Sequence, residues 1–287
     1  MIANGSNLGP YVVRKELGQG ITGRVYYAWD PEGNLPVAIK VLDPELAKDA
    51  GSRTMFEEEG RAGLTVDSPQ LVKTLMMGEQ NGHKFIAFEY VHGVPLARLI
   101  PDGPLGEAEC VWVMRHAAQA IRELSRKGIV HQDIKPENIL IEKTGNCKLS
   151  DLGFARVKGG RVKWDGYSAG TAFYMSPEQC QPWLRLPIDT RSDLYALGAV
   201  IYHAATGHPP FEAEKEEDVR EMHIKQPVHS ALDHNPALTP QFSGFLLQMM
   251  NKDPERRFRS AEELLLEIRQ LPVKACAPVV NISGVSE

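Results

Sequence analysis

Short apolar runs in the first third of the chain predict β-strands. The runs YVVRKEL (11–17), RVYYAWD (24–30) and LPVAIKVL (35–42) are separated by glycine-rich or turn-forming segments. Two more runs, at 70–77 and 84–91, predict a further pair of strands joined by a turn. The pattern therefore predicts a small, mainly antiparallel sheet.

Helical spacing dominates the rest of the chain. One helix is expected within the sheet region at 52–66, and a second from Glu107 to Lys127, where apolar residues recur every three or four positions. Segment 138–153 predicts a short hairpin. The apolar segment 194–207 contains a histidine and is too short to cross a bilayer, so it predicts a buried core helix.

These elements predict an α+β protein with two lobes and a tail. The expected boundaries are 1–91 for the strand-rich lobe, 92–272 for the helical lobe and 273–287 for a tail without an assignable pattern. Ser260 followed by Glu263 is a capping-box pattern that predicts the start of the last helix. A cleft between two lobes is a natural ligand site.

Composition narrows the class of protein. The chain has 287 residues, 43% of them hydrophobic, and a net charge of −5, so it lacks the basic character of a nucleic-acid binder. Its cysteines are scattered without a CxxC pair, which argues against zinc and against a disulfide framework. With no secretory signal and no membrane segment in the sequence, we expect a cytoplasmic protein with reduced thiols.

A glycine-rich loop offers a phosphate site. The segment GQGITGRV places Gly18, Gly20 and Gly23 where their backbone N–H groups could approach phosphate oxygens. Dinucleotide-binding folds share this spacing but need a helix directly afterwards, whereas VYY follows here and favours a strand. The expected structure is a hairpin over phosphates, with a plain β-turn as the alternative.

Lys40, in the segment VAIK, is the candidate cation for this phosphate site. A buried lysine stays ionised only beside a carboxylate, and the helix at 52–66 offers Glu57, Glu58 and Glu59. At least two of these glutamates are expected on a solvated face.

The segment HQDIKPEN (131–138) combines residues suited to phosphoryl transfer. Asp133 could accept a hydroxyl proton, Lys135 could hold a transferring phosphate, and Asn138 could ligate Mg²⁺. The predicted hairpin would return Asp151, in the segment DLG, beside Asn138 as a second oxygen ligand. Each residue also has a structural alternative, because both aspartates could be turn residues.

Six motifs in this order resemble the catalytic domain of a protein kinase. They are the glycine loop, VAIK, HQDIKPEN, DLG, GTAFYMSPE and SDLYALG, and the resemblance covers about residues 10–272. The family is the serine/threonine type that is also common in bacteria. The resemblance implies a bilobal kinase fold, with transfer of the γ-phosphoryl group of ATP to Ser or Thr hydroxyls of a protein.

The resemblance also implies roles for individual residues. Asp133 would be the catalytic base, with Lys135 beside it, and Asn138 and Asp151 would bind Mg²⁺, or Mn²⁺ in its place. Lys135 and Thr171 resemble the serine/threonine branch of the family.

The nucleotide site follows in the same way. Lys40 would pair with Glu59, with Glu58 as the fallback. Phe88 would stand at the gatekeeper position, which implies a small pocket behind ATP. The implied nucleotide-binding residues are Gly18, Gly20, Gly23, Val25, Ala38, Lys40, Phe88, Glu89 and Val91. Away from the nucleotide, Glu178 would pair with Arg257, and Asp193 would hold the backbone of the catalytic loop.

Gln132 departs from the family pattern, which has arginine there to bind a phosphate on the activation segment. A neutral amide cannot replace that forked, charged contact. Between Asp151 and Gly170 the only hydroxyl side chains are Tyr167 and Ser168. We therefore expect a catalytic loop that is not controlled through the usual phosphate.

Two other departures concern packing. Leu152 replaces phenylalanine in DFG, a mild apolar change. Gly63 lies four residues after Glu59, where the family has a bulky apolar residue. The resulting gap could loosen the helix and leave it dependent on an activating partner, unless Leu64 fills the space.

The alternative functions are a pseudokinase scaffold, a small-molecule phosphotransferase and a nucleotide-binding oxidoreductase. Lys40, Asp133 and Asp151 are all present, which argues against the first. The GTAFYMSPE segment argues against the second, and the strand after Gly23 argues against the third. A protein substrate is the expected partner.

Overall fold

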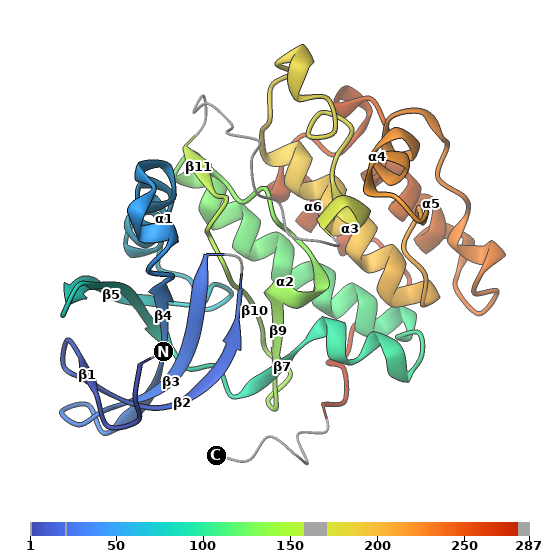
Figure 1. The fold of residues 1–287 in the computed structure, drawn as a ribbon. Helices are drawn as coiled ribbons and strands as arrows, with labels where there is room; N and C mark the ends of the chain where they lie inside the picture. The colour runs from blue at the N-terminus through green and yellow to red at the C-terminus, as the bar shows by residue number, and fades with distance from the viewer. Residues whose placement is uncertain (1, 21, 158–170, 281–287) are drawn as a thin grey trace. The chain divides into compact units, whose positions relative to one another are not determined.

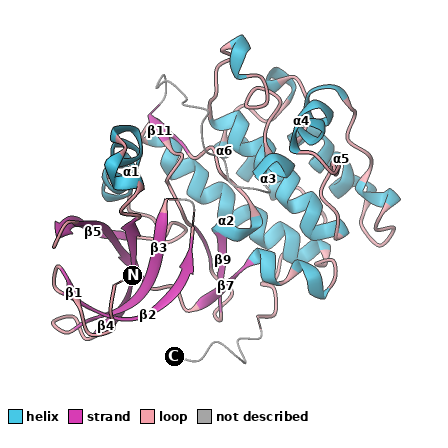
Figure 2. Ribbon diagram, in the orientation of Figure 1, coloured by secondary structure: helices cyan, strands magenta, loops and turns pink. Residues whose placement is uncertain are grey.

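The computed structural model describes residues 2–20, 22–157 and 171–280. The chain divides into two compact units, residues 1–91 with 151–155 and residues 92–150 with 156–287. Figure 2 shows that the first unit holds a sheet and one main helix, while helices predominate in the second.

The first unit contains a six-stranded antiparallel sheet with the strand order β1-β2-β3-β4-β6-β5 (Figure 1). Its helix α1 spans Ala50–Leu64 and begins with the Asp49 carboxylate accepting the Ser52 N–H at 2.7 Å. The strands are β1 (Asn7–Leu8), β2 (Tyr11–Gln19), β3 (Gly23–Asp30), β4 (Leu35–Leu42), β5 (Thr74–Gln80) and β6 (His83–Glu89). The predicted sheet and helix are therefore confirmed.

The start of β5 is a correction to the predicted strand at 70–77. Leu71 N–H donates to the carbonyl of Ser68 at 3.1 Å, so a turn occupies the first part of that apolar run. The strand begins only at Thr74.

Strand β4 shows how the sheet separates its core from its functional face. Val37, Ile39 and Val41 point into one hydrophobic core, with side chains from β2, β3 and β6. Because side chains alternate across a strand, Ala38 and Lys40 share the opposite face. This is the face on which Leu42, Phe56 of α1 and Ile86 pack together.

The packing of α1 corrects both expectations about Gly63. A Cβ at Gly63 would lie 2.0 Å from Thr74 Oγ1 and 2.9 Å from Thr74 Cβ, so no gap exists there. Leu64 does not fill the space, since it is 49% exposed. The glycine instead lets α1 lie directly against β5, which seats the helix within its own unit.

The second unit is built around two long helices, α2 (Glu107–Arg126) and α3 (Thr190–Thr206), as predicted. Almost all of α3 is buried. The remaining helices are α4 (Glu216–Lys225), α5 (Pro240–Met249) and α6 (Ala261–Ile268), and the short strands are β7 (Gly93–Pro95), β8 (Ile129–Val130), β9 (Ile139–Glu142), β10 (Cys147–Leu149) and β11 (Arg156–Val157). Strands β9 and β10 form the predicted hairpin. No described helix is long and apolar enough to cross a membrane.

The capping-box prediction for α6 is half confirmed. The Ser260 side chain accepts the Glu263 N–H at 3.2 Å, as expected for the first residue of the box. The Glu263 carboxylate, however, accepts from the N–H of Arg259 rather than from that of Ser260.

The described part of the C-terminal tail lies on the second unit. Cys276 N–H donates to the carbonyl of Ala108 in α2 at 3.2 Å. A Cβ at Gly145 would lie 2.3 Å from the Cβ of Ala277, so the tail also packs closely on the β9–β10 turn. Of the free cysteines, Cys276 is exposed, while the other three, Cys110, Cys147 and Cys180, are buried.

Candidate active site

The glycine loop is a β-hairpin, as the following strand predicted. Gly20 N–H donates to the carbonyl of Gly23 at 2.8 Å, and Gly18 pairs with Val25 across β2 and β3 after a register shift. A Cβ at Gly23 would lie 1.9 Å from the Val41 carbonyl oxygen, so only glycine fits there. At Gly18 no heavy atom lies within 4 Å of the corresponding position, which leaves space for a ligand.

Lys40 lies at the centre of a buried ion cluster in the first unit. Its Nζ is 2.8 and 2.9 Å from the two carboxylate oxygens of Glu59 and 3.2 Å from Oδ1 of Asp151. These three contacts use all three ammonium hydrogens. The predicted pairing of Lys40 with Glu59 is therefore confirmed.

The buried surroundings affect the pKa of Lys40 and that of Glu59 differently. Burial disfavours the Lys40 ammonium, but Asp151 and Glu59 outweigh it and raise the lysine pKa, so Lys40 is cationic. Burial raises the pKa of Glu59 to about 7, against the opposing effect of Lys40. Glu59 is thus the group in the cluster that can take up a proton near neutral pH.

The three candidate glutamates have different surroundings on α1. Glu59 is only 2% exposed, whereas Glu58 is exposed to solvent. Glu57 accepts from Arg61 at 2.8 Å and from Lys84 at 3.1 Å on the helix surface. The fallback position, Glu58, therefore does not contact Lys40.

The residues expected around adenine lie on the neighbouring strands β3, β4 and β6, with Val25 on β3, and on the segment after β6. Ala38 of β4 pairs with Phe88 of β6, and Phe88 packs against the cluster of Leu42, Phe56 and Ile86. Glu89 N–H donates to the Lys73 carbonyl at 2.9 Å. Among the described residues, the N–H of Val91 makes no hydrogen bond.

The catalytic-loop residues are held by a dense set of contacts in the second unit. Asn138 Nδ2 donates to the Asp133 carbonyl at 2.8 Å and to Asp133 Oδ2 at 3.1 Å. Lys135 Nζ lies 2.9 Å from the same Oδ2. Because Asn138 turns its nitrogen toward Asp133, its Oδ1 is the atom suited to a cation.

His131 is fully buried and has a defined tautomer. Its Nδ1 lies 3.3 Å from the N–H of Asp133 and therefore accepts, while its Nε2 lies 3.1 Å from the Ser150 carbonyl and therefore donates. The ring is thus a neutral structural link between the catalytic loop and the end of the β9–β10 hairpin.

Gln132 adopts a left-handed backbone with φ of 67°, which glutamine does not favour. Asp193 holds this conformation, because its two carboxylate oxygens accept the N–H groups of His131 and Gln132 at 2.8 Å each. Burial raises the pKa of Asp193 to about 7, although both N–H groups favour its charged form. The predicted contact between Asp193 and the loop backbone is confirmed.

Asp151 also has a left-handed backbone, with φ of 64°. Its Oδ1 accepts the Gly153 N–H at 3.1 Å in addition to Lys40, and its side chain is 39% exposed. An exposed carboxylate and an amide oxygen suit Mg²⁺, which keeps several waters and takes few protein ligands. Among the described residues no group of three or more His, Cys, Asp or Glu forms a metal cage.

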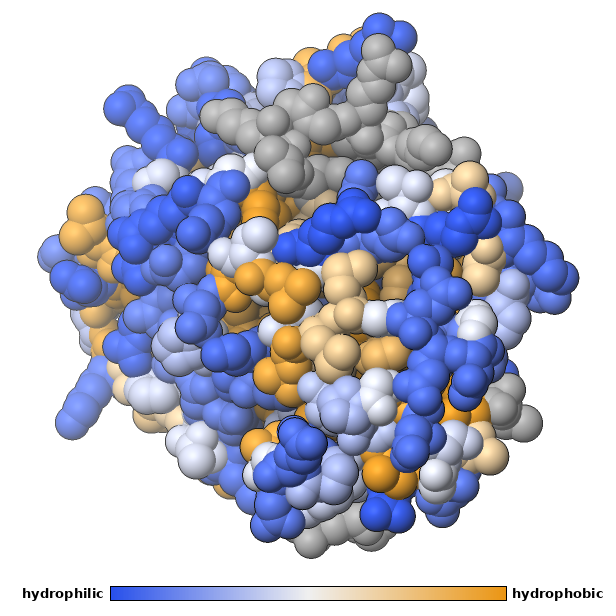
Figure 3. Space-filling model, turned by 90° about the vertical axis from the view of Figure 1, so that its left-hand side faces the viewer, coloured by the Kyte–Doolittle hydropathy of each residue, from blue (hydrophilic) through white to orange (hydrophobic). Residues whose placement is uncertain are grey.

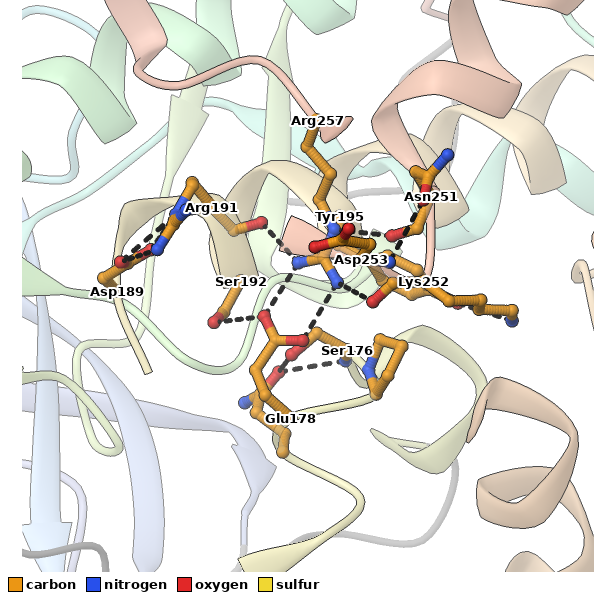
Figure 4. Close-up of polar contacts among 12 residues, drawn as sticks. Ser176, Glu178, Asp189, Arg191, Ser192, Tyr195, Asn251, Lys252, Asp253 and Arg257 are labelled. Carbon is orange, nitrogen blue, oxygen red and sulfur yellow. Dashed lines mark hydrogen bonds and ion pairs between the residues drawn. The ribbon is translucent and has the colours of Figure 1, made fainter. Parts of the chain in front are cut away.

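Glu178 and Arg257 form the predicted ion pair, shown in Figure 4. The guanidinium donates to both carboxylate oxygens at 2.7 and 2.9 Å. Its remaining hydrogens reach three backbone carbonyls, those of Arg191, Asn251 and Lys252. The Ser192 hydroxyl also donates to the Glu178 carboxylate at 2.7 Å, so the pair is buried and fully hydrogen-bonded. Arg257 and Ser192 hold the pKa of Glu178 low, despite its burial.

Gln179 is a contact residue that the sequence did not reveal. Its side-chain amide joins Ser176 to the carbonyl of Gln132 within the second unit. A glutamine carries no charge and fits no catalytic pattern. In the sequence, only its place directly after Glu178 could have drawn attention to it.

Some predicted residues fall outside the described part of the chain. These are Tyr167 and Ser168, as well as the side chain of Thr171. Thr171 itself begins the short helical turn Thr171–Tyr174.

Comparison with known proteins agrees with this geometry. A model of the protein kinase domain matches residues 11–267. The chain is 32% identical over 91% of its length to serine/threonine-protein kinase PrkC of Bacillus subtilis, and 33% identical over 90% to PknB of Mycolicibacterium smegmatis. It spans only 40% and 42% of those two proteins.

Solved structures show the same fold. The kinase domain of Mycobacterium tuberculosis PknI superimposes with a TM-score of 0.73, covering 94% of this chain and 99% of that one at 24% identity. The expected α+β kinase fold is therefore confirmed, and the chain belongs to the protein kinase domain family.

Proposed function

We propose that this chain transfers the γ-phosphoryl group of ATP to Ser or Thr hydroxyls of a protein substrate. The observation that supports the proposal is that the candidate residues of each unit are held together by close polar contacts. Lys40 is held as a cation by Glu59 and Asp151 in the first unit. Asp133 is held by Asn138 and Lys135 in the second.

In the first unit, the glycine hairpin and Lys40 would bind the nucleotide. Backbone N–H groups of the hairpin would meet phosphate oxygens, with Gly18 and Gly20 giving them close access. Lys40 would neutralise phosphate charge, and Glu59 would fix the direction of its ammonium group. Val25 and Ala38 would contact the faces of adenine, Phe88 would limit the pocket behind it, and the backbone of Glu89 and Val91 would bind its edge.

In the second unit, Asp133 would accept the proton of the attacking hydroxyl. Lys135 would stabilise the transferring phosphoryl group, on which negative charge is spread in the transition state. Positioning supplies much of the rate in such reactions, since the transferred group needs little covalent help. The contacts of Asp133 with Asn138 and Lys135 would provide that positioning.

Asn138 and Asp151 would hold the divalent metal, Mg²⁺ or Mn²⁺. When bound, the ion would neutralise phosphate oxygens. Both residues offer oxygen atoms, which is the donor type that such ions take.

We further propose a cytoplasmic enzyme with a Ser/Thr-containing protein as its partner. The free cysteines support this compartment, and the relatives' names support the substrate class. An activating partner that seats α1 is not part of the proposal, because Thr74 already fills the space beside Gly63.

The test compares wild-type protein with Asp133→Asn, using γ-labelled ATP, Mg²⁺ and a generic basic protein. We expect label in the substrate with the wild type alone, while both proteins bind ATP in a fluorescence titration. Near wild-type turnover by the variant would contradict the role of Asp133. Binding of ATP without transfer by either protein would support a non-catalytic scaffold instead.

We propose in addition that activity does not require a phosphate on the activation segment, because Gln132 offers no charge to bind one. The test is phosphatase treatment of the wild type, with Ser168→Ala and Thr171→Ser measured beside it. Turnover of the treated wild type should remain within about twofold of the untreated enzyme, because loss of a forked Arg–phosphate contact would reduce turnover by more than that. A large loss on dephosphorylation would contradict this.

A further inference from the structure

Gln179 connects the catalytic loop to the segment that follows Thr171. It is 1% exposed, and Ser176 and Gln132 at the two ends of the link are 0% and 7% exposed. Gln179 Nε2 donates to the Gln132 carbonyl at 2.9 Å, while its Oε1 accepts from the N–H and the hydroxyl of Ser176 at 3.1 Å each. The amide bridges two segments far apart in sequence.

The partners leave only one orientation for this amide. The Gln132 carbonyl can only accept and the Ser176 N–H can only donate, so the nitrogen faces Gln132 and the oxygen faces Ser176. Breaking either contact of this buried amide would leave a buried polar group unsatisfied.

The bond to the Gln132 carbonyl fixes the peptide group that leads into Asp133. That carbonyl and the N–H of Asp133 belong to one planar unit. Gln179 holds the oxygen of this unit, and His131 Nδ1 lies 3.3 Å from its N–H. Since Asp193 holds the preceding N–H of Gln132, the strained residue is fastened on both sides.

We propose that Gln179 is a positioning residue for Asp133. It sets the peptide plane before the base and ties it to the segment that follows Thr171 through a neutral link that needs no phosphate. This inference rests on the proposed kinase function, since Asp133 must be the base for its position to matter.

The rival explanation is that Gln179 only stabilises the turn at Ser176, and three variants separate the two. Gln179→Met keeps the length of the side chain and loses both bonds. Gln179→Glu keeps an acceptor for Ser176 but loses the donor to Gln132. Ser176→Ala removes only one hydroxyl at the far end.

Steady-state kinetics with ATP and the generic basic protein, well below the unfolding temperature, supply the readout. We expect Gln179→Met and Gln179→Glu to lose about tenfold in kcat while KM for ATP is unchanged, because a buried bond near the base is lost. Ser176→Ala should remain within about twofold of wild type. Should Gln179→Met not fold, Gln179→Glu carries the comparison.

The pH profile of Gln179→Glu gives a further readout that simple stabilisation would not move. A protonated carboxyl can donate to the Gln132 carbonyl. The ratio of the variant's kcat to that of the wild type should therefore rise as the pH is lowered from about 8 to about 6. Wild-type kcat in Gln179→Glu at all pH values would overturn the inference, whether or not Gln179→Met is impaired. An inactive wild type would instead count against the proposed function.

Discussion

Two buried ion pairs in this chain differ in how completely their atoms are satisfied. The guanidinium of Arg257 has acceptors for all its hydrogens, and its side chain is 0% exposed. In the Lys40 cluster, Asp151 remains 39% exposed and the pKa of Glu59 is raised to about 7. The first pair is a closed structural unit, whereas the second keeps one carboxylate accessible to a ligand and one near its titration point.

The difference suggests a way to distinguish structure from function among buried charges. A pair whose donors and acceptors are all used can only stabilise the fold that orders it. A cluster that exposes one member and tolerates a proton on another can respond to substrate. Both contain buried charged side chains, so burial alone would not separate them.

The largest expected effect is on the closed pair. Arg257→Met should lower the free energy of unfolding by about 3–5 kcal/mol, because Glu178 is left buried without its partner. Chemical denaturation of the second unit measures this. The double variant Glu178→Gln with Arg257→Met should recover part of the loss, and a single variant as stable as wild type would contradict the comparison.

Lys40→Met should reduce activity strongly and stability only slightly. We expect phosphoryl transfer to fall by about a hundredfold or more, because a cation aimed at phosphate is lost. Unfolding should change much less than in Arg257→Met, since Glu59 can take up a proton when its partner is removed. Equal losses of stability in the two variants would remove the distinction.

The seat of α1 can be disturbed without touching the ion cluster. Gly63→Ala should destabilise the first unit by about 1–3 kcal/mol, because the new methyl group would overlap Thr74 and push α1 from β5. Nucleotide affinity should fall with it as Glu59 moves. Adding Thr74→Ala removes the Oγ1 that lies 2.0 Å from the new Cβ, so it should restore part of both quantities.

The smallest expected effect is a pH dependence that arises in the cluster of Lys40, Glu59 and Asp151. Glu59 has a folded pKa of about 7, above that of an unfolded glutamate, so its contribution to stability is full at low pH and is lost as pH rises through 7. Activity should change the other way, falling in acid as Glu59 is protonated and its grip on Lys40 weakens.

Glu59→Gln separates this group from Asp193, whose pKa is also about 7. The wild-type minus variant difference in unfolding free energy should decrease from acid to neutral pH. The acid limb of kcat/KM should be absent in Glu59→Gln. Titration of Glu178 should not change the free energy of unfolding near neutral pH, because the pKa of this group is lowered.

Much of the fold was predictable because the hydrophobic pattern matched it directly. Val37, Ile39 and Val41 alternate with Ala38 and Lys40, and the structure places the two sets on opposite faces of β4. The choice of Glu59 among neighbouring glutamates came from family register rather than from periodicity. The apolar run at 70–77 misled, since it begins with a turn closed by Leu71, and the strand starts only at Thr74.

The features that sequence could not give depend on distances between elements. The contact of Gly63 with Thr74 follows from how closely α1 approaches β5, which no local pattern encodes. The left-handed backbone of Gln132 is imposed by Asp193, because glutamine itself does not prefer it. Gln179 acts through an ordinary neutral amide, so only its partners reveal it.

The surface seen in Figure 3 is largely hydrophilic, with smaller hydrophobic areas between charged side chains. Single exposed apolar residues are ordinary on a folded protein. Leu64 of α1 is among the exposed apolar residues, at 49%.

The distribution of thiols makes the tail accessible to spectroscopy. Burial raises the pKa of Cys110, Cys147 and Cys180, so these thiols should resist maleimide reagents that attack the thiolate, whereas Cys276 is exposed. A dye could therefore be attached at Cys276 without mutagenesis. Because the N–H of that residue is bonded to Ala108, the dye would report in real time whether the tail stays on α2 during turnover.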